Sequence, residues 1–358
     1  MVIFAYLGAV IGAGFASGQE VVQFFVSYGD GGLWGALAAT LLFGMSGALL
    51  MHRTHYLKTS RYQALFSTIM GPRMSLIVDA GLGLFLFLGI STMFSASGAV
   101  FYEHLYLPKN LGIIAAYLVV AAFLLWGKRG LVFSYNILVP LKIILLLGVA
   151  GWVAFGPASP DVNSAVLYYV YPESRYWMVS CVLYVAYNFS LAMVVLTEYQ
   201  SIANRLDSIK GAWWGGVILG MLVLLTYLAL RKHLPVVLHY EVPMLYVAGQ
   251  VSITAKHVYT LVLWMGIITT AIANTYGFAQ RFTAFTGLNY RFCLILSMTM
   301  ALPLSMKSFS QLVGYIYPLF GLLGVLILGA LWLGAVKDMG RDLYYNVMKQ
   351  IVGQGGKK

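Results

Sequence analysis

Ten apolar segments, each about 15 to 30 residues long, follow one another along this chain with short polar connections between them. A membrane-spanning helix needs roughly 20 apolar residues, because the hydrocarbon core of a bilayer is about 30 Å thick. Hydrophobic residues make up 61% of the 358 residues and charged residues only 9%, whereas a soluble domain carries about 25% charged residues. The sequence therefore predicts an all-α integral membrane protein with ten transmembrane helices. These cover approximately residues 3–28, 33–52, 74–102, 111–126, 131–155, 174–200, 211–230, 256–282, 292–306 and 308–336.

The basic residues are distributed unequally between the two sides of this predicted bundle. Of the 22 Lys and Arg residues, fifteen fall in loops on one side and six on the other, and Lys142 lies inside a crossing. Cytoplasmic loops carry an excess of Lys and Arg, so the formal net charge of +11 reflects orientation in the lipid bilayer rather than binding of nucleic acid. We expect a multi-pass protein of the cell (inner or plasma) membrane with both termini in the cytoplasm.

Three segments lie outside the crossings. Residues 52–72 are basic and partly amphipathic, which is typical of a helix at the cytoplasmic interface. Residues 231–255 hold a short apolar run flanked by prolines, too short to span a bilayer, and we expect them to form an extracellular lid over the bundle. Residues 337–358 are predicted to form a cytoplasmic tail.

Two of the crossings are interrupted by residues that weaken a helix. Four glycines lie between residues 8 and 18, and a polar run occupies residues 184–190 of the sixth crossing; glycine alone costs about 1 kcal/mol per site relative to alanine. Paired interruptions in corresponding positions of two halves are typical of an inverted-repeat transporter with a site at the membrane midplane. We therefore predict two five-helix repeats, residues 1–155 and 156–336, with discontinuous first and sixth helices. The alternative is that the glycines are small-xxx-small packing motifs in continuous helices.

A resemblance to a known family comes from the first of these interruptions. Residues 9–20 read Ala-Val-Ile-Gly-Ala-Gly-Phe-Ala-Ser-Gly-Gln-Glu, which resembles the first-helix signature of the amino acid–polyamine–organocation (APC) superfamily, and in particular its YkvI-like membrane proteins. The number of crossings, the paired interruptions and the lid extend the resemblance over nearly the whole chain. It implies the LeuT-type fold, in which ten helices form two inverted repeats and access alternates around helices one and six.

The two interruptions supply the candidate substrate-binding residues. A broken helix frees backbone N–H groups, and the half-helix that begins near the break directs them, with its positive dipole end, toward the midplane, where they suit a carboxylate. Glycines allow close approach, polar side chains satisfy further polar atoms, and aromatic rings form the apolar wall. The candidates are Gly12, Ala13, Gly14, Phe15, Tyr184, Tyr187, Asn188 and Ser190.

A sodium site is predicted separately on helix eight. Gly266, Thr269 and Thr270 have the spacing i, i+3, i+4 and share one helix face. Together with the carbonyl groups of Gly8 and Ile11 they would supply five hard oxygen ligands, an arrangement similar to the sodium site that sodium-coupled members of the fold share between helices one and eight. The alternative is that both threonines donate hydrogen bonds to carbonyl groups of their own helix.

Three of the ionisable residues within the predicted crossings are candidates for a function or an ion pair. Lys142 is at the centre of helix five, where a charge costs a few kcal/mol and is functional by default; sodium-independent relatives resemble this chain in having a lysine there, whose ammonium replaces sodium. A protonated Lys142 and a sodium ion would repel each other, so the two mechanisms are rivals. Glu20, one turn beyond the break, is a candidate gate, amine-binding or proton-carrying residue. Asp79 is expected to pair with a cytoplasmic base.

These features predict a secondary active transporter of a small amino-acid-like or amine-bearing solute, working by alternating access. Sodium coupling is narrowly favoured over proton coupling. The alternatives are a sodium-independent exchanger organised by Lys142 and a membrane sensor that binds an amino acid without moving it. The sequence contains no arrangement of nucleophile and base, metal ligands or phosphate loop, so neither an enzyme nor a cofactor other than sodium is expected. The substrate and the oligomeric state stay open.

Overall fold

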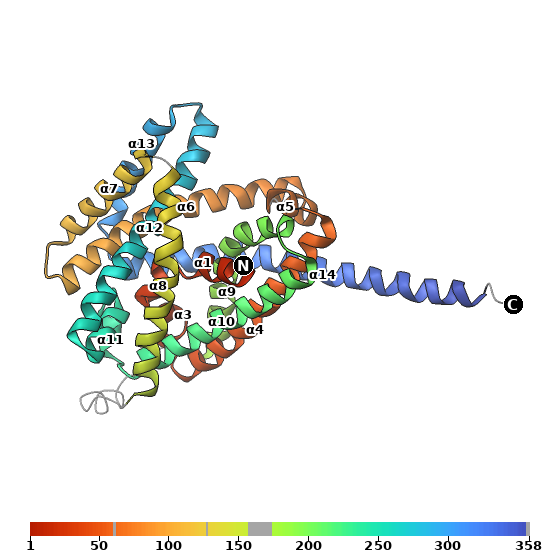
Figure 1. Cartoon of the computed structure of the whole chain (residues 1–358), viewed down its shortest axis with the longest axis horizontal. Helices are drawn as coiled ribbons and strands as arrows, with labels where there is room; N and C mark the ends of the chain where they lie inside the picture. The colour runs from red at the N-terminus through yellow and green to blue at the C-terminus, as the bar shows by residue number, and fades with distance from the viewer. Residues whose placement is uncertain (60–61, 127, 157–173, 356–358) are drawn as a thin grey trace.

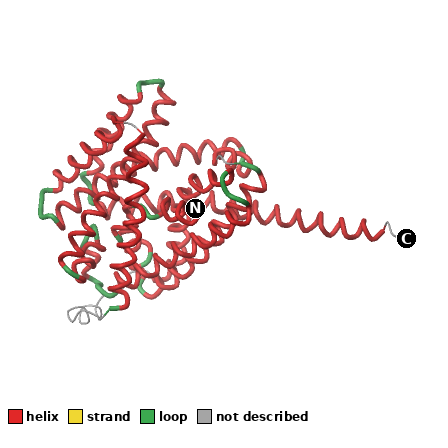
Figure 2. Tube along the Cα trace, in the orientation of Figure 1, coloured by secondary structure: helices red, strands yellow, loops and turns green. Residues whose placement is uncertain are grey.

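A computed structural model describes residues 1–59, 62–126, 128–156 and 174–355, and almost all of them are helical (Figure 2). Among these described residues, six helices are long and apolar enough to cross a membrane. These six are α4 (Asp30–Leu57), α6 (Pro72–His104), α9 (Trp177–Glu198), α10 (Arg205–Arg231), α12 (Ile253–Thr286) and α14 (Phe309–Gly355). Three further helices are α7 (Lys109–Trp126), α8 (Lys128–Phe155) and α13 (Tyr290–Ser305), whose apolar stretches are shorter: Lys109–Leu125, Pro140–Phe155 and Tyr290–Ser305. The chain is an all-α, multi-pass membrane protein, and the count of ten crossings stays a prediction.

Helices α4 and α10 run in opposite directions, as the contacts between their ends show. The start of α4 meets the end of α10 through the ion pair between Asp30 and Arg231. Arg205, at the start of α10, contacts His52 near the end of α4. The bundle therefore has two ends. We call one the Asp79 end, after Asp79 on α6, and the other the Glu241 end, after Glu241 in the connection between α10 and α12. Beyond the Asp79 end, α14 continues as a single helix that projects away from the bundle (Figure 1).

The N-terminal segment is broken, as the sequence predicts. It consists of α1 (Val2–Val10), α2 (Ala13–Ser17) and α3 (Gln19–Phe24). Between α1 and α2, Ile11 has ψ of 73° and Gly12 is extended. A second break, not predicted, occurs at Gly18, which has φ of +83°; a Cβ there would also lie only 2.6 Å from Cγ of Met244. Glycine is the residue that adopts this conformation at little cost.

The prediction of a discontinuous sixth helix is wrong: α9 is a regular helix through residues 184–190. The polar side chains that suggested a break bond within the helix instead. Asn188 Nδ2 donates to the carbonyl group of Tyr184 at 3.1 Å, and Ser190 Oγ donates to that of Ala186 at 2.7 Å. Each bond satisfies a polar side chain without freeing the backbone, so these residues do not require unwinding.

The two connecting segments outside the crossings both contain a short helix. Helix α5 (Tyr62–Met70) lies between α4 and α6 and packs against α6. The predicted lid holds η5 (Val236–His239) and α11 (Pro243–Val251), and α11 packs against α8 and α12 and contacts α2. Residues 231–255 therefore fold onto the bundle next to the broken segment.

Candidate functional site

The carboxyl group of Glu20 lies at the centre of the bundle, folded back over the helix break. Glu20 is on α3, two residues after the Gly18 turn, and it is only 4% exposed. Tyr187 of α9 donates a hydrogen bond to Glu20 Oε2, and the side chain of Asn188 also interacts with this carboxyl group. A Cβ added to Gly14 would overlap Glu20 Oε1 and would lie 3.1 Å from Cδ. The carboxyl group therefore fills the space directly over Gly14.

Aromatic rings surround this carboxyl group. The ring centroids of Tyr187 and Tyr317 are 5.0 Å apart, and Phe24 stacks on Tyr187 at 5.7 Å. Phe85 of α6 lies 6.0 Å from Tyr317 and 6.4 Å from Tyr187. The hydroxyl oxygen of Tyr317 would lie 3.1 Å from a Cβ on Gly14, so both tyrosines have their polar ends at the break.

Close packing between α9 and α14 brings these tyrosines together. A Cβ on Gly324 would overlap the carbonyl oxygen of Ala186 and lie 2.9 Å from the amide nitrogen of Tyr187. A Cβ on Gly321, one turn earlier, would lie 2.9 Å from the carbonyl oxygen of Leu183. Small residues at such contacts let helix backbones approach closely in membranes. The two glycines therefore set the spacing that the tyrosine pair requires.

A small, mainly apolar cavity adjoins the tyrosines on the side of the Asp79 end. Among its lining residues, only Ser190 and Tyr187 have polar side chains, and its free volume is about 10 Å³. The lining residues come from α6, α9 and α14: Leu82, Phe85, Tyr187, Ser190, Leu191, Phe320 and Leu323.

Within the described part of the chain, no lysine or arginine forms an ion pair with Glu20. The ion pairs of Asp30, Asp79 and Glu241 with basic side chains are all at the ends of the bundle. An ionised carboxylate buried without a cation costs several kcal/mol. The site is therefore suited to take up a positive charge, either as a proton on Glu20 or as a cationic ligand.

The structure unites some of the predicted substrate residues and separates others. Gly14, Tyr187 and Asn188 meet around Glu20. Tyr184 is buried beside them, with its ring centroid 5.7 Å from that of Tyr187 and 4.9 Å from that of Phe25. The other predicted residues lie near the site without a described contact to the Glu20 carboxyl group: Ala13 and Phe15 are buried in α2, Gly12 forms the break, and Ser190 lines the cavity.

The residues of α12 that are predicted to bind sodium lie beside Lys142, which is on α8. The hydroxyl groups of Thr269 and Thr270 both donate to the carbonyl group of Gly266, at 2.9 and 3.0 Å. Cδ of Lys142 would be 3.4 Å from a Cβ on Gly266, and Lys142 is 6% exposed. The lysine on α8 therefore packs against the face of α12 that carries the threonines.

The first-helix members of that predicted set lie at the end of α1. Gly8 belongs to α1, and Ile11 is the buried residue that follows it at the break. The neighbouring segment α2 is attached to α12 by a hydrogen bond from the Tyr259 hydroxyl group to the carbonyl group of Ala16, at 2.6 Å. The broken first helix and α12, which is helix eight of the sequence prediction, are thus in direct contact. Among the described residues, no group of three or more His, Cys, Asp or Glu side chains could hold a metal ion.

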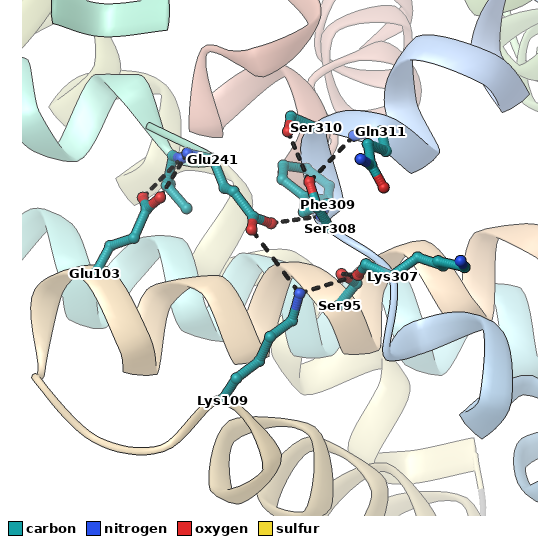
Figure 3. Close-up of polar contacts among 10 residues, drawn as sticks. Ser95, Glu103, Lys109, Glu241, Lys307, Ser308, Phe309, Ser310 and Gln311 are labelled. Carbon is teal, nitrogen blue, oxygen red and sulfur yellow. Dashed lines mark hydrogen bonds and ion pairs between the residues drawn. The ribbon is translucent and has the colours of Figure 1, made fainter. Parts of the chain in front are cut away.

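At the Glu241 end, a polar network attaches the lid to three other segments (Figure 3). The carboxylate of Glu103 accepts hydrogen bonds from the backbone N–H groups of Glu241 and Val242, at 2.7 and 3.2 Å. Glu241 in turn accepts from the N–H group of Phe309 and lies 3.8 Å from Lys109 Nζ. Burial raises the pKa of Glu241 above its ordinary value, although Lys109 and Phe309 act in the opposite direction.

The same network includes the connection between α13 and α14. Lys109 Nζ and Ser95 Oγ both donate to the carbonyl group of Lys307, at 2.9 and 2.6 Å (Figure 3). The lid, α6, α7 and this connection therefore form one hydrogen-bonded closure over the Glu241 end.

At the Asp79 end, a second closure joins α5, α6 and α12. Tyr62 donates to Asp79 Oδ1 at 2.8 Å, and Arg281 donates to the same oxygen at 3.0 Å and to the Tyr62 hydroxyl group at 2.5 Å. Burial raises the pKa of Tyr62 to about 12, so its hydroxyl group keeps the proton that it donates. The expected pairing of Asp79 with a basic residue is confirmed, and its partner is Arg281.

Sequence reasoning missed the contributions of Phe24, Phe85 and Tyr317. Tyrosine is too common for one to stand out, since the chain contains 25 tyrosines and 20 phenylalanines. No sequence signal marks Tyr317 as a partner of Glu20, because the two residues are distant in the sequence and meet only when α14 packs on α9.

Comparison with known proteins identifies both a relative and a fold. No family model matches the chain. The chain is 32% identical over 335 residues to YkvI, an uncharacterized membrane protein of Bacillus subtilis (strain 168), and the match covers 92% of this chain and 93% of the relative.

Two solved structures share the arrangement of helices. Mhp1 in an inward-facing conformation matches with a TM-score of 0.59 and 15% identity, over 90% of this chain and 72% of Mhp1. MhsT in complex with L-phenylalanine matches with a TM-score of 0.59 and 14% identity, over 91% of this chain and 87% of MhsT. The chain belongs to the family of membrane proteins that contains YkvI, and it has the LeuT-type fold.

Proposed function

We propose that the chain is a secondary active transporter of a small amine-bearing, amino-acid-like solute, working by alternating access. The observation that carries this proposal is the broken first helix at the bundle centre, with the buried carboxyl group of Glu20 folded over it. Irregular backbone at membrane depth is tolerated where it lines a cavity or binds a ligand. The LeuT-type fold supports the same function, because Mhp1 is described as a nucleobase-cation-symport-1 family transporter.

The closures at the two ends of the bundle support alternating access. The site lies between the Glu241 network and the Asp79–Arg281 contact, so opening either one exposes it to one side only. We propose that the Asp79 end faces the cytoplasm, together with both termini, because the basic loops gather at that end. The two repeats of the sequence prediction then rock against each other around the break.

The coupling ion separates two versions of this function. In the first, Gly266, Thr269 and Thr270 bind sodium together with carbonyl groups of the first helix. In the second, the ammonium group of Lys142 occupies this face and sodium has no role. The packing of Lys142 against Gly266 and the engagement of both threonine hydroxyl groups with the Gly266 carbonyl group favour the second version, which we propose. An ammonium within about 4 Å of a sodium ion costs about 4 kcal/mol at an effective dielectric constant of 20.

Uptake into proteoliposomes tests the function. We expect a radiolabelled solute that stabilises the purified protein to enter vesicles that contain the full chain, and to exchange with unlabelled solute inside. Replacing sodium by potassium at constant pH should leave the rate unchanged. Binding without any flux would contradict transport and would favour the sensor; uptake that requires sodium would contradict the Lys142 version alone.

A further inference from the structure

The space that a substrate carboxylate was expected to occupy is already filled by the chain. The sequence predicts that the backbone at the break receives an anionic group next to Gly12 and Gly14. Instead, Oε1 of Glu20 lies over Gly14, and Oε2 accepts the hydrogen bond of Tyr187. A second carboxylate approaching Gly14 would meet a like charge or would have to displace Glu20.

The surroundings of this carboxyl group suit the opposite charge. No described lysine or arginine neutralises it, and the rings of Phe85, Tyr187 and Tyr317 gather next to it. Aromatic faces attract organic cations through their quadrupoles. The adjoining cavity is lined by apolar side chains apart from Ser190 and Tyr187. Its free volume of about 10 Å³ is that of one water molecule, so a hydrocarbon group attached to the cation enters only when the lining side chains move apart.

We infer that the ligand of this site is a primary organic amine without a carboxylate group. Its ammonium group pairs with Glu20 next to Gly14, and its apolar part lies between the aromatic rings, which move apart and widen the adjoining cavity when the ligand binds. This inference rests on the proposed function only in taking the helix break as the substrate site. It narrows the substrate from amino-acid-like solutes to their decarboxylated counterparts.

Matched pairs of probes that differ only by the carboxylate test the inference. Phenethylamine and isopentylamine should each raise the unfolding temperature of the purified full chain, because a ligand that binds only the folded state stabilises it. Phenylalanine and leucine, at the same concentrations, should produce no shift. Phenylpropionate, which has the ring and the carboxylate without the amine, should also produce none.

Variants connect this binding to the site. Glu20→Gln keeps the size of the side chain and removes its charge, so it should weaken amine binding roughly 10- to 100-fold, which corresponds to the loss of a hydrogen bond to a charged group. The matched control is Glu198→Gln, at an exposed carboxyl group near the end of α9, which should bind amines as the wild type does. Glu20→Asp keeps the charge and should retain part of the affinity.

Gly14→Ala tests the geometry separately from the charge. Its methyl group would overlap Glu20 Oε1, so it should weaken amine binding although Glu20 is intact. The melting transition without ligand shows whether each variant folds.

Two results would overturn the inference: amino acids that stabilise the protein as strongly as their amines, or amines whose effect is the same in Glu20→Gln as in the wild type. A complete lack of amine binding at millimolar concentrations would overturn it as well. Failure of the transport proposal looks different, since amines would then bind in a Glu20-dependent way without crossing the vesicle membrane. Uptake of an amino acid in preference to its amine would contradict the substrate class and leave transport standing.

Discussion

The closure formed by Tyr62, Asp79 and Arg281 should control how often the Asp79 end opens. In the closed state, Asp79 Oδ1 accepts two hydrogen bonds, one of them from a charged donor. Asp79→Asn keeps the shape of the side chain and removes its charge. Hydrogen bonds to charged groups contribute about 1.5–3 kcal/mol when buried. The Asp79 and Arg281 side chains are 35% and 31% exposed, so solvent screening reduces the expected loss to about 1–2 kcal/mol.

A loss of this size should shift the ratio of open to closed molecules roughly 5- to 30-fold. Hydrogen–deuterium exchange of α5 measures the shift, because α5 is held at this end through Tyr62. Exchange in α5 should accelerate by the same factor in Asp79→Asn, and exchange in α11 at the other end should not. Asp207→Asn, at an exposed carboxyl group near the start of α10, is the control and should leave α5 unchanged.

The charge-swapped double variant Asp79→Arg/Arg281→Asp provides the strictest comparison. It restores opposite charges at the same two positions and should recover part of the protection of α5. Equal exchange rates in the wild type and in Asp79→Asn would refute the assignment of a closure to these residues. Loss of protection at both ends together would instead show that the substitution destabilises the whole bundle.

Three further predictions concern coupling, packing and pH. Lys142→Ala should keep the fold and lose the pH dependence of uptake, and sodium-dependent uptake that is intact in this variant would reject the lysine version. Gly324→Val should cost about 1–3 kcal/mol of stability, because its side chain must force α14 away from α9; thermal unfolding checks this against Gly329→Ala, whose Cβ meets nothing within 4 Å. Since the closed lid raises the pKa of Glu241, the closed lid is favoured most below the ordinary pKa of this group and progressively less as pH rises through the raised value. Exchange in α11 should therefore increase with pH after correction for the intrinsic rate, and Glu241→Gln should remove this increase.

The backbone break in the first helix could be predicted from the sequence, whereas the regular course of α9 could not. Glycine at residues 12 and 18 lowers helix stability wherever it lies, so the signal is intrinsic. Asn188 and Ser190 are ambiguous in the sequence. The same side chains can line an unwound segment or donate hydrogen bonds to the carbonyl groups four residues earlier in a regular helix. Only the packed helix shows which alternative holds.

The position of Glu20 was beyond sequence reasoning for a different reason. A helix that continued from Gly14 would put Glu20 nearly two turns away along the axis. The left-handed turn at Gly18 bends α3 so that the carboxyl group returns to Gly14. The glycine is evident in the sequence, but the close approach of Met244 in the lid, which leaves no room for a Cβ at Gly18, is not.

That contact gives the Gly18 turn a consequence for affinity. Gly18 lies two residues from Glu20 on one side and touches Met244 of the lid on the other. A ligand that shifts Glu20 and a force that shifts the lid therefore act on the same stretch of backbone. Linkage between two such events is reciprocal. If the bound ligand raises the equilibrium constant for lid closure by some factor, then a closed lid raises the affinity for the ligand by that same factor. A disulfide or an antibody fragment that holds the lid closed should therefore increase ligand affinity.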